Sequence, residues 1–189
     1  MSEITIEQAD LQSVRRLLHE VFPASDKFET LDFLRWHYTV NPDGSAIWRD
    51  AVVGGVSRAH YGAIPQWYHS CQSQKKLLYL SVNSATHAMM RGKGMFTRLG
   101  EAVYAAILAA DPPAAGVVGV PNREAYQPRI KRLGWQIVGV LPLLVNLGLP
   151  MGRSAATSFL AAEALTGSRR LIDDDMLAPG EGWRQRWNL

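Results

Sequence analysis

A basic, glycine-rich turn stands between two segments of different hydrophobic pattern. Residues 91–94 (RGKG) follow the apolar segment of residues 77–82 and precede a helical pattern with four apolar positions, which are Phe96, Leu99, Val103 and Ile107. Such a turn can bind phosphate, because glycines let the backbone approach an anion and the first N–H groups of a helix point toward it. Arg91, Lys93 and Arg98 add full positive charges. The sequence therefore predicts a phosphate-binding turn.

Two other phosphate-binding motifs fit this segment less well. A dinucleotide fingerprint requires a third glycine, and Thr97 stands at that position. A P-loop requires serine or threonine after its Gly-Lys pair, whereas Gly94 follows Lys93. The plain structural alternative is a turn that begins a helix and carries solvated charges.

The composition is that of an ordinary globular protein. The chain has 189 residues, enough for one domain with a real core, and its net charge is +3 with a pI of about 9.2. This small, dispersed excess suits a polyanionic ligand and does not indicate nucleic-acid binding. The single cysteine, Cys71, cannot form an intrachain disulfide. With no apolar run of about 18 residues and no secretory signal, we expect a cytoplasmic protein without a membrane span.

Alternating and helical patterns predict the order β-α-α-β-β-β-α-β-α-β. Strands are expected at residues 4–7, 46–53, 56–64, 76–86, 116–120 and 136–145. Helices are expected after an Asp10 cap, at residues 31–38, after the glycine turn, and at residues 123–133. Gly54-Gly55 indicates a hairpin. Pro128 is expected in the first turn of its helix or at a break in it.

The glycine turn resembles a family signature. Residues 91–96 (RGKGMF) resemble the Arg/Gln-x-x-Gly-x-Gly/Ala motif of the GNAT superfamily of N-acetyltransferases, with Phe96 where glycine or alanine is usual. Residues 36–44 (WHYTVNPDG) and 60–65 (HYGAIP) resemble GNAT proteins often found with polysaccharide and cell-surface biosynthesis. Asn122, followed by Leu-Gly-Trp at residues 133–135, resembles the Asn…Leu-Gly-Phe signature that closes the GNAT motif set. The resemblance covers about residues 3–147.

This resemblance implies an α/β fold of the GNAT type. Its mixed, mostly antiparallel sheet would have six or seven strands flanked by about four helices, and it would splay between strands 4 and 5. We expect an acyl-CoA-binding domain over residues 1–150 and an extension over residues 151–189, helical at 154–165. The extension either completes an altered sheet edge or comes from a longer chain that was cut. The final strand, at 136–145, could pair between subunits and form a homodimer.

The resemblance also implies acetyl-CoA as the co-substrate. Its pyrophosphate would lie on the glycine turn, and its pantetheine would run along the backbone of strand 4. An N–H at Ser84 or Ala85 would then polarise the thioester carbonyl. The residues expected to bind the cofactor are Ser84, Ala85, Thr86, Arg91, Gly92, Lys93, Gly94, Met95, Phe96 and Asn122.

The catalytic residues are less well marked. The family often has a tyrosine that protonates the leaving thiolate, but Ile130 occupies its place, so Tyr126 is the nearest candidate acid. His60 and His87 are the candidate bases, since imidazole titrates near neutral pH, and a water chain is the alternative. The histidines and the cysteine show no zinc spacing, so no metal is expected.

The resemblance therefore implies an acetyl-CoA-dependent N-acetyltransferase, in which a primary amine attacks the thioester directly in a ternary complex. The acceptor stays open among amino sugars, amino acids, peptide or protein N-termini and small amines. Its site would lie by the first two helices and strand 3, where Trp36, Tyr38, Tyr61, Trp67 and Tyr68 could supply walls. A catalytically silent GNAT-like module that binds CoA or a protein partner is the alternative. A transferase that uses aminoacyl-tRNA would not need the pyrophosphate turn and is disfavoured.

Overall fold

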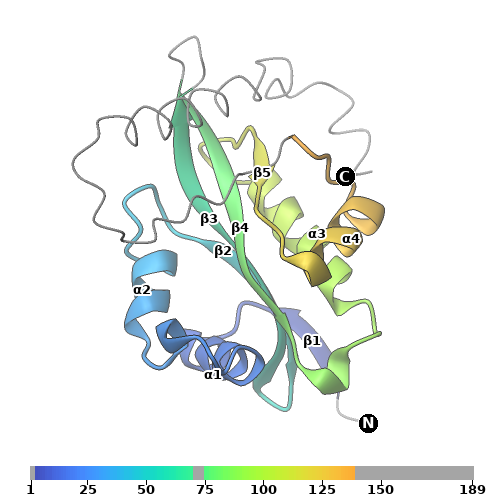
Figure 1. Cartoon of the computed structure of the whole chain (residues 1–189). Coiled ribbons are helices and arrows are strands. Elements are labelled where there is room, and N and C mark those ends of the chain that lie inside the picture. The colour runs from blue at the N-terminus through green and yellow to red at the C-terminus, as the bar shows by residue number, and fades with distance from the viewer. Residues whose placement is uncertain (1–2, 70–74, 139–189) are drawn as a thin grey trace, which may run out of the picture.

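The computed structural model describes residues 3–69 and 75–138 and shows one sheet between two layers of helices (Figure 1). The elements are β1 (Ile4–Glu7), α1 (Leu11–Val21), α2 (Asp32–Tyr38), β2 (Ile47–Val53), β3 (Val56–His69), β4 (Lys75–Thr86), α3 (Met95–Leu108), β5 (Gly116–Val118) and α4 (Arg123–Arg132). Short 3-10 turns lie at Asp26–Phe28 and Ala88–Met90. The predicted element order is confirmed as far as α4.

The sheet has five strands in the order β1-β2-β3-β4-β5 within the described residues. All neighbours are antiparallel except β4 and β5, which are parallel. The β2–β3 hairpin turns at Gly54 and Gly55, whose φ angles of 58° and 76° are those of a primed turn. β3 is longer than predicted and continues through Pro65. This proline lies beyond Ala63, the last residue of β3 that pairs with β2, so β2 requires no N–H from it.

One face of the sheet is covered by α1 and α2. Asp10 caps α1 as predicted, since its carboxylate accepts hydrogen bonds from the N–H groups of Gln12 and Ser13. The apolar side chains of α1 and α2 pack with Trp48 and Ile64 of the sheet. The buried members of this core are Val14, Leu17, Leu18, Phe28, Leu34, Tyr38, Ala46, Trp48, Ile64 and Ala85.

The other face is covered by α3, with α4 beside it (Figure 1). The apolar positions predicted after the glycine turn bury Leu99, Val103 and Ile107 completely against the sheet. Leu133, directly after α4, is also fully buried and lies close to Gly100 of α3. A Cβ on Gly100 would stand 2.9 Å from the Leu133 side chain, so the close contact between α3 and this corner requires a small residue.

The helix α4 continues through Pro128, contrary to the prediction that this proline would lie in the first turn or break the helix. Pro128 is the sixth residue of α4, so a single intrahelical hydrogen bond is lost. The Asn122 cap precedes the proline, and the buried side chains of Arg129 and Leu133 follow it, so both flanking turns are held.

The first three residues of the strand predicted at 136–145 do not form a strand. Residues 136–138 have no regular secondary structure, and residues 139–145 lie outside the described part of the chain. The expected extension over residues 151–189 and its helix at 154–165 also lie outside it, so the extension and a dimer through the last strand stay predictions. Among the described helices, none is long and apolar enough to cross a membrane.

Candidate active site

The strands β4 and β5 separate, as the resemblance to GNAT proteins implies. They pair only from Leu78 to Leu80 of β4, while β4 itself continues to Thr86. Beyond Leu80, therefore, one edge of β4 has no β5 partner and its backbone groups are open to a ligand on that side. This is the point at which a chain-like ligand could add to the sheet.

A β-bulge interrupts β4 in this open region. Between the pairs His60–Ala85 and Gly62–Val82, β4 has one residue more than β3, and Asn83 adopts a positive φ of 53°. Asn83 and Ser84 have no register partner in β3. Because of the extra residue, the side chains of Ser81 and Ser84 reach the same side of the sheet, which a regular strand would not allow.

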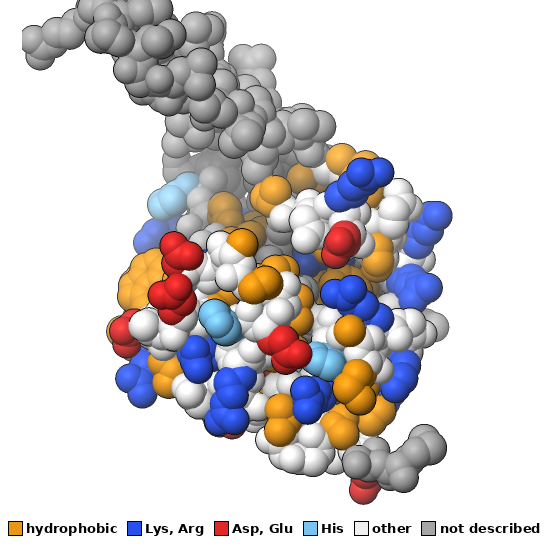
Figure 2. Space-filling view, turned by 60° about the horizontal axis from the view of Figure 1, so that its bottom comes forward, with side chains coloured by type: hydrophobic (Ala, Val, Ile, Leu, Met, Phe, Trp, Pro, Cys, Tyr) orange, Lys and Arg blue, Asp and Glu red, His pale blue; other side chains and the backbone are white. Residues whose placement is uncertain are grey.

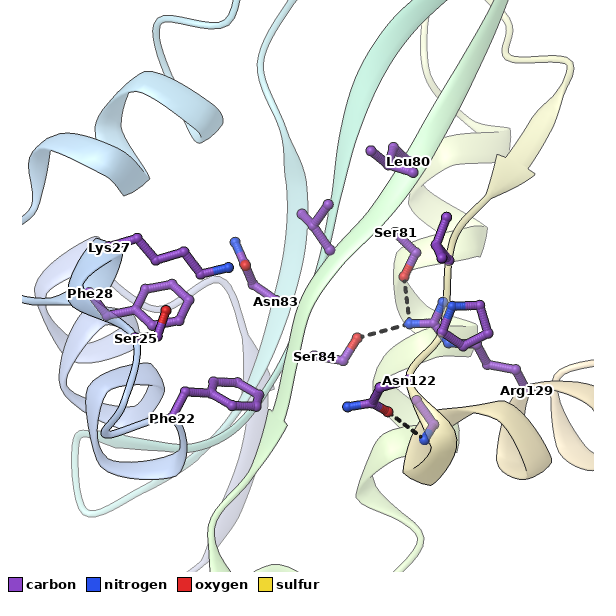
Figure 3. Close-up of a pocket in the computed structure, with 14 residues that line it drawn as sticks. Phe22, Ser25, Lys27, Phe28, Leu80, Ser81, Asn83, Ser84, Asn122 and Arg129 are labelled. Carbon is purple, nitrogen blue, oxygen red and sulfur yellow. Dashed lines mark hydrogen bonds between the residues drawn. The ribbon is translucent and has the colours of Figure 1, made fainter. Parts of the chain in front are cut away.

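A cavity of about 440 Å³ lies where the strands separate, and we call it the splay pocket. It is lined by Phe22, Ser25, Lys27 and Phe28 near α1, by Leu80, Ser81, Val82, Asn83 and Ser84 of β4, and by Val120, Pro121, Asn122, Ala125 and Arg129. Figure 3 shows Lys27 reaching toward Asn83 on one side of β4, while Ser81 and Ser84 point to Arg129 on the other. Among the described lining residues, only Lys27 and Arg129 are charged.

A second cavity, of about 260 Å³, lies at the glycine turn, and we call it the turn pocket. Gly94, with a φ of 72°, is the residue before the first turn of α3, and the first intrahelical bond is donated by the N–H of Arg98. The N–H groups of Met95, Phe96 and Thr97 therefore have no helical partner. They present donors and the positive end of the helix dipole, as an anion site requires.

The predicted cofactor residues gather in the turn pocket. Its lining includes every one of them except Lys93: Ser84, Ala85, Thr86, Arg91, Gly92, Gly94, Met95, Phe96 and Asn122. Ser84 and Asn122 also line the splay pocket, so the two cavities share a boundary. The hydroxyl of Thr97, another lining residue, is buried without a hydrogen-bond partner in the described structure. A ligand oxygen in the turn pocket could supply that partner.

His60, a candidate base, is buried in a polar network on the α2 side of the sheet. Its Nδ1 lies 3.0 Å from Oδ1 of Asp50, and its Nε2 lies 2.8 Å from the Tyr38 hydroxyl. Asn83 donates to the same hydroxyl at 3.3 Å. Burial, followed by the nearby Asp50 carboxylate, raises the pKa of Tyr38 despite the Asn83 bond, so the phenol stays protonated. His60 does not line either pocket.

His87, the other candidate base, also has both ring nitrogens occupied. Its Nε2 lies 2.8 Å from a Glu20 carboxylate oxygen, and its Nδ1 accepts the N–H of Met89. The ring therefore links α1 to the 3-10 turn after β4 and is absent from the lining of both pockets. A catalytic role for either histidine stays a prediction.

Tyr126, the candidate acid, is half-buried in α4 but lines neither pocket. The face of α4 toward the splay pocket carries Asn122, Ala125 and Arg129 instead. The role of Tyr126 as an acid also stays a prediction. None of the five aromatic residues expected to line the acceptor site is in the splay pocket, and Tyr38 and Tyr61 are fully buried in the two cores.

On the face that Figure 2 shows, basic and acidic side chains both occur, and several of each sign lie near one another. Within residues 3–69 and 75–138, no cluster of three His, Cys, Asp or Glu side chains could hold a metal ion.

Comparison with known proteins adds to this geometry. No family model matches the chain, and no curated protein matches it. Among solved structures, a predicted acetyltransferase with acetyl-CoA from Clostridium acetobutylicum is similar, with a TM-score of 0.58 and 15% identity over 77% of this chain and 97% of that one. Glucosamine-6-phosphate N-acetyltransferase from Arabidopsis thaliana matches with a TM-score of 0.54 and 11% identity, over 81% and 99% of the two chains.

An aminoglycoside N-acetyltransferase in complex with CoA is also similar, with a TM-score of 0.56 and 16% identity over 78% of this chain and 97% of that one. These matches place the described chain in the GNAT fold, with its mostly antiparallel sheet and parallel β4–β5 pair. At such identities the likeness shows the fold alone, so the chemistry is argued from the residues of this chain.

Proposed function

We propose that this protein is an N-acyltransferase that uses acetyl-CoA and binds its pyrophosphate at the turn pocket. One observation carries the proposal: the free N–H groups at the start of α3 and the end of β4, the strand whose edge is open, line the same turn pocket. The GNAT fold and the similar structures with acetyl-CoA or CoA bound support it. The specific subgroup suggested by residues 36–44 and 60–65 remains part of this proposal.

The two pockets suggest how the reactants would be arranged. The pyrophosphate would accept hydrogen bonds at the turn pocket, and the pantetheine would follow β4 from Thr86 toward Ser84. The thioester would then reach the shared boundary at Ser84 and Asn122, and the amine would approach through the splay pocket. Backbone N–H groups near the bulge could polarise the thioester carbonyl, whose oxygen gains negative charge as the amine attacks. A solvent water that enters the splay pocket could accept the amine proton.

Binding of acetyl-CoA should depend on Arg91. The Arg91 side chain is exposed at the mouth of the turn pocket and makes one long bond, 3.4 Å from its Nε to the Thr86 carbonyl. Isothermal titration should show micromolar binding to the wild-type protein. Arg91→Ala should weaken it by about 1.5–3 kcal/mol, because a charge-assisted hydrogen bond to phosphate is lost. Arg35→Ala, at an exposed position of α2, should bind normally. Equal binding by all three proteins would remove Arg91 from the site.

A silent CoA-binding module is the second candidate, and one observation favours it. No described residue that lines the splay pocket is a histidine, aspartate or glutamate, so no carboxylate or imidazole among them could serve as the base for the acceptor amine. Release of free CoA thiol from acetyl-CoA, measured with a panel of amino sugars, amino acids, peptides and small amines, separates the two. An active enzyme should release thiol with at least one class of amine, together with an acetylated product by mass. Binding without any release would favour the module.

A further inference from the structure

The wall of the splay pocket contains a buried cation that has no carboxylate partner among the described residues. Arg129 is only 4% exposed, yet it forms no ion pair with any described residue. Its Nε and Nη1 atoms are buried without a hydrogen-bond partner. Because a buried charge is costly unless it is paired, a guanidinium in a pocket wall with no carboxylate partner in the described part of the chain points to a ligand that supplies the negative charge.

Aromatic rings surround this guanidinium but cannot neutralise it. Its central carbon lies 4.7 Å from the Trp135 ring, 5.6 Å from the Tyr61 ring and 5.8 Å from the Phe96 ring. Such contacts hold the cation in place and offset part of the lost hydration. They provide no acceptor for its N–H groups, so the need for an anion remains.

Two serine hydroxyls extend the positive site toward the pocket. Nη2 of Arg129 donates to Oγ of Ser81 at 3.0 Å and to Oγ of Ser84 at 3.3 Å (Figure 3). Each hydroxyl accepts from the guanidinium, and neither donates its own proton to any described residue. The two polarised O–H groups are thus available to a ligand oxygen. The β4 bulge creates this arrangement, since it brings Ser81 and Ser84 to one side.

The position of this site relates it to the reacting groups. Ser84 lies at the boundary of the two pockets, while Ser81 and Arg129 line only the splay pocket, beyond the proposed thioester position. Lys27 supplies the one other charge in the described lining, and it is also positive. A reactant that carries only an ammonium group would find no opposite charge here. A reactant with a carboxylate would.

We propose that Arg129, with the hydroxyls of Ser81 and Ser84, binds a carboxylate carried by one of the two reactants. The carboxylate would belong either to the acyl group of the donor, as in a dicarboxylic acid monothioester, or to an amino-acid-like acceptor. This inference deepens the proposed function and rests on it for the identity of the reactants. The anion site itself is a property of Arg129 and its serines.

The donor is tested by titration with succinyl-CoA and acetyl-CoA. If the donor carries the carboxylate, wild-type protein should bind succinyl-CoA about tenfold more tightly or better, and Arg129→Gln should lose that preference while keeping acetyl-CoA binding. If the acceptor carries it, the two thioesters should bind alike. Turnover with acetyl-CoA should then favour amino acids over their amides in the wild type, and Arg129→Gln should lower kcat/KM for the acids alone. Arg123→Gln, exposed on the same helix, is the matched control.

A measurement without CoA separates this proposal from the proposed function. Succinate should raise the melting temperature of the wild-type protein, and succinamide should not. The rise should disappear in Arg129→Gln and shrink in Ser81→Ala, which leaves the guanidinium in place. This result would stand even if CoA did not bind. No carboxylate preference in the thermal, donor and acceptor measurements would overturn the proposal. An equal loss of kcat for every donor and acceptor would also overturn it, since Arg129 would then stabilise the reaction's own oxyanion.

Discussion

Gly94→Glu should eliminate measurable binding of acetyl-CoA. The new side chain would place a carboxylate at the N-terminus of α3, where the free N–H groups and the helix dipole favour an anion. It would occupy the proposed pyrophosphate site and repel the pyrophosphate. Isothermal titration against the wild-type protein measures the loss.

A control for Gly94→Glu is available in the β2–β3 hairpin. Gly55 has a φ of 76°, close to the 72° of Gly94, and a Cβ at either residue would have no neighbour within 4 Å. Gly55→Glu therefore introduces the same charge and similar backbone strain at a residue that lines neither pocket. It should bind acetyl-CoA like the wild type. Binding that survives in Gly94→Glu, or that is lost equally in Gly55→Glu, would contradict the assignment of the turn.

Asp50→Ala should destabilise the fold by about 3–5 kcal/mol, because it removes one partner of a buried network and leaves the others unpaired. Asp50 is fully buried. Its carboxylate accepts from the Ser57 hydroxyl at 2.6 Å, from Nδ1 of His60 at 3.0 Å and from the N–H of Ala9 at 3.2 Å. With Nδ1 protonated, Tyr38 donates to Nε2 of the same ring, so the whole network is satisfied. Urea unfolding measures the change in free energy.

Two further variants serve as comparisons for Asp50→Ala. Asp50→Asn keeps an oxygen acceptor and should cost less than Asp50→Ala. Glu101→Ala, at an exposed position of α3, should change the free energy of unfolding by no more than about 0.5 kcal/mol. If Asp50→Ala were as mild as the Glu101 variant, the network would not be a structural element of the core.

Local patterns predicted much of the fold because they report local physics. Asp10 before an apolar helical pattern, the Gly54-Gly55 pair and the glycine turn before α3 each specify a backbone conformation within a few residues. The structure contains all three. Pro128 was misjudged because a proline's effect depends on what holds the turns around it. Here the Asn122 cap and the buried side chain of Arg129 hold them.

The catalytic end of the site could not be predicted in the same way. The bulge at Asn83 depends on the register between β3 and β4. Asparagine tolerates the positive φ found there, but its presence alone does not locate a bulge. Without the bulge, Ser81 and Ser84 would be expected on opposite faces. The sequence offered one signal for Arg129: its spacing places this cation on the same side of the helix as Asn122 and Ala125. Its burial depends on Trp135 and the strands, so only the folded chain shows it.

The histidines illustrate the same limit. A histidine in a sequence is a reasonable candidate base near neutral pH. The structure instead engages both nitrogens of His60 with Asp50 and Tyr38, and both nitrogens of His87 with Glu20 and Met89. Asp50, Tyr38 and Glu20 lie at least ten residues away in the sequence, and the Met89 contact depends on the local backbone geometry. The residues next to each histidine in the sequence therefore do not predict these partners.

A crystal structure of the protein with acetyl-CoA tests the central claim most directly. The account predicts pyrophosphate oxygens within hydrogen-bonding distance of the N–H groups at the start of α3, with the pantetheine along β4 from Thr86 to Ser84. It also predicts the thioester at the boundary between the turn pocket and the splay pocket. A pyrophosphate bound elsewhere, or a turn pocket left empty at a saturating concentration of acetyl-CoA, would contradict it.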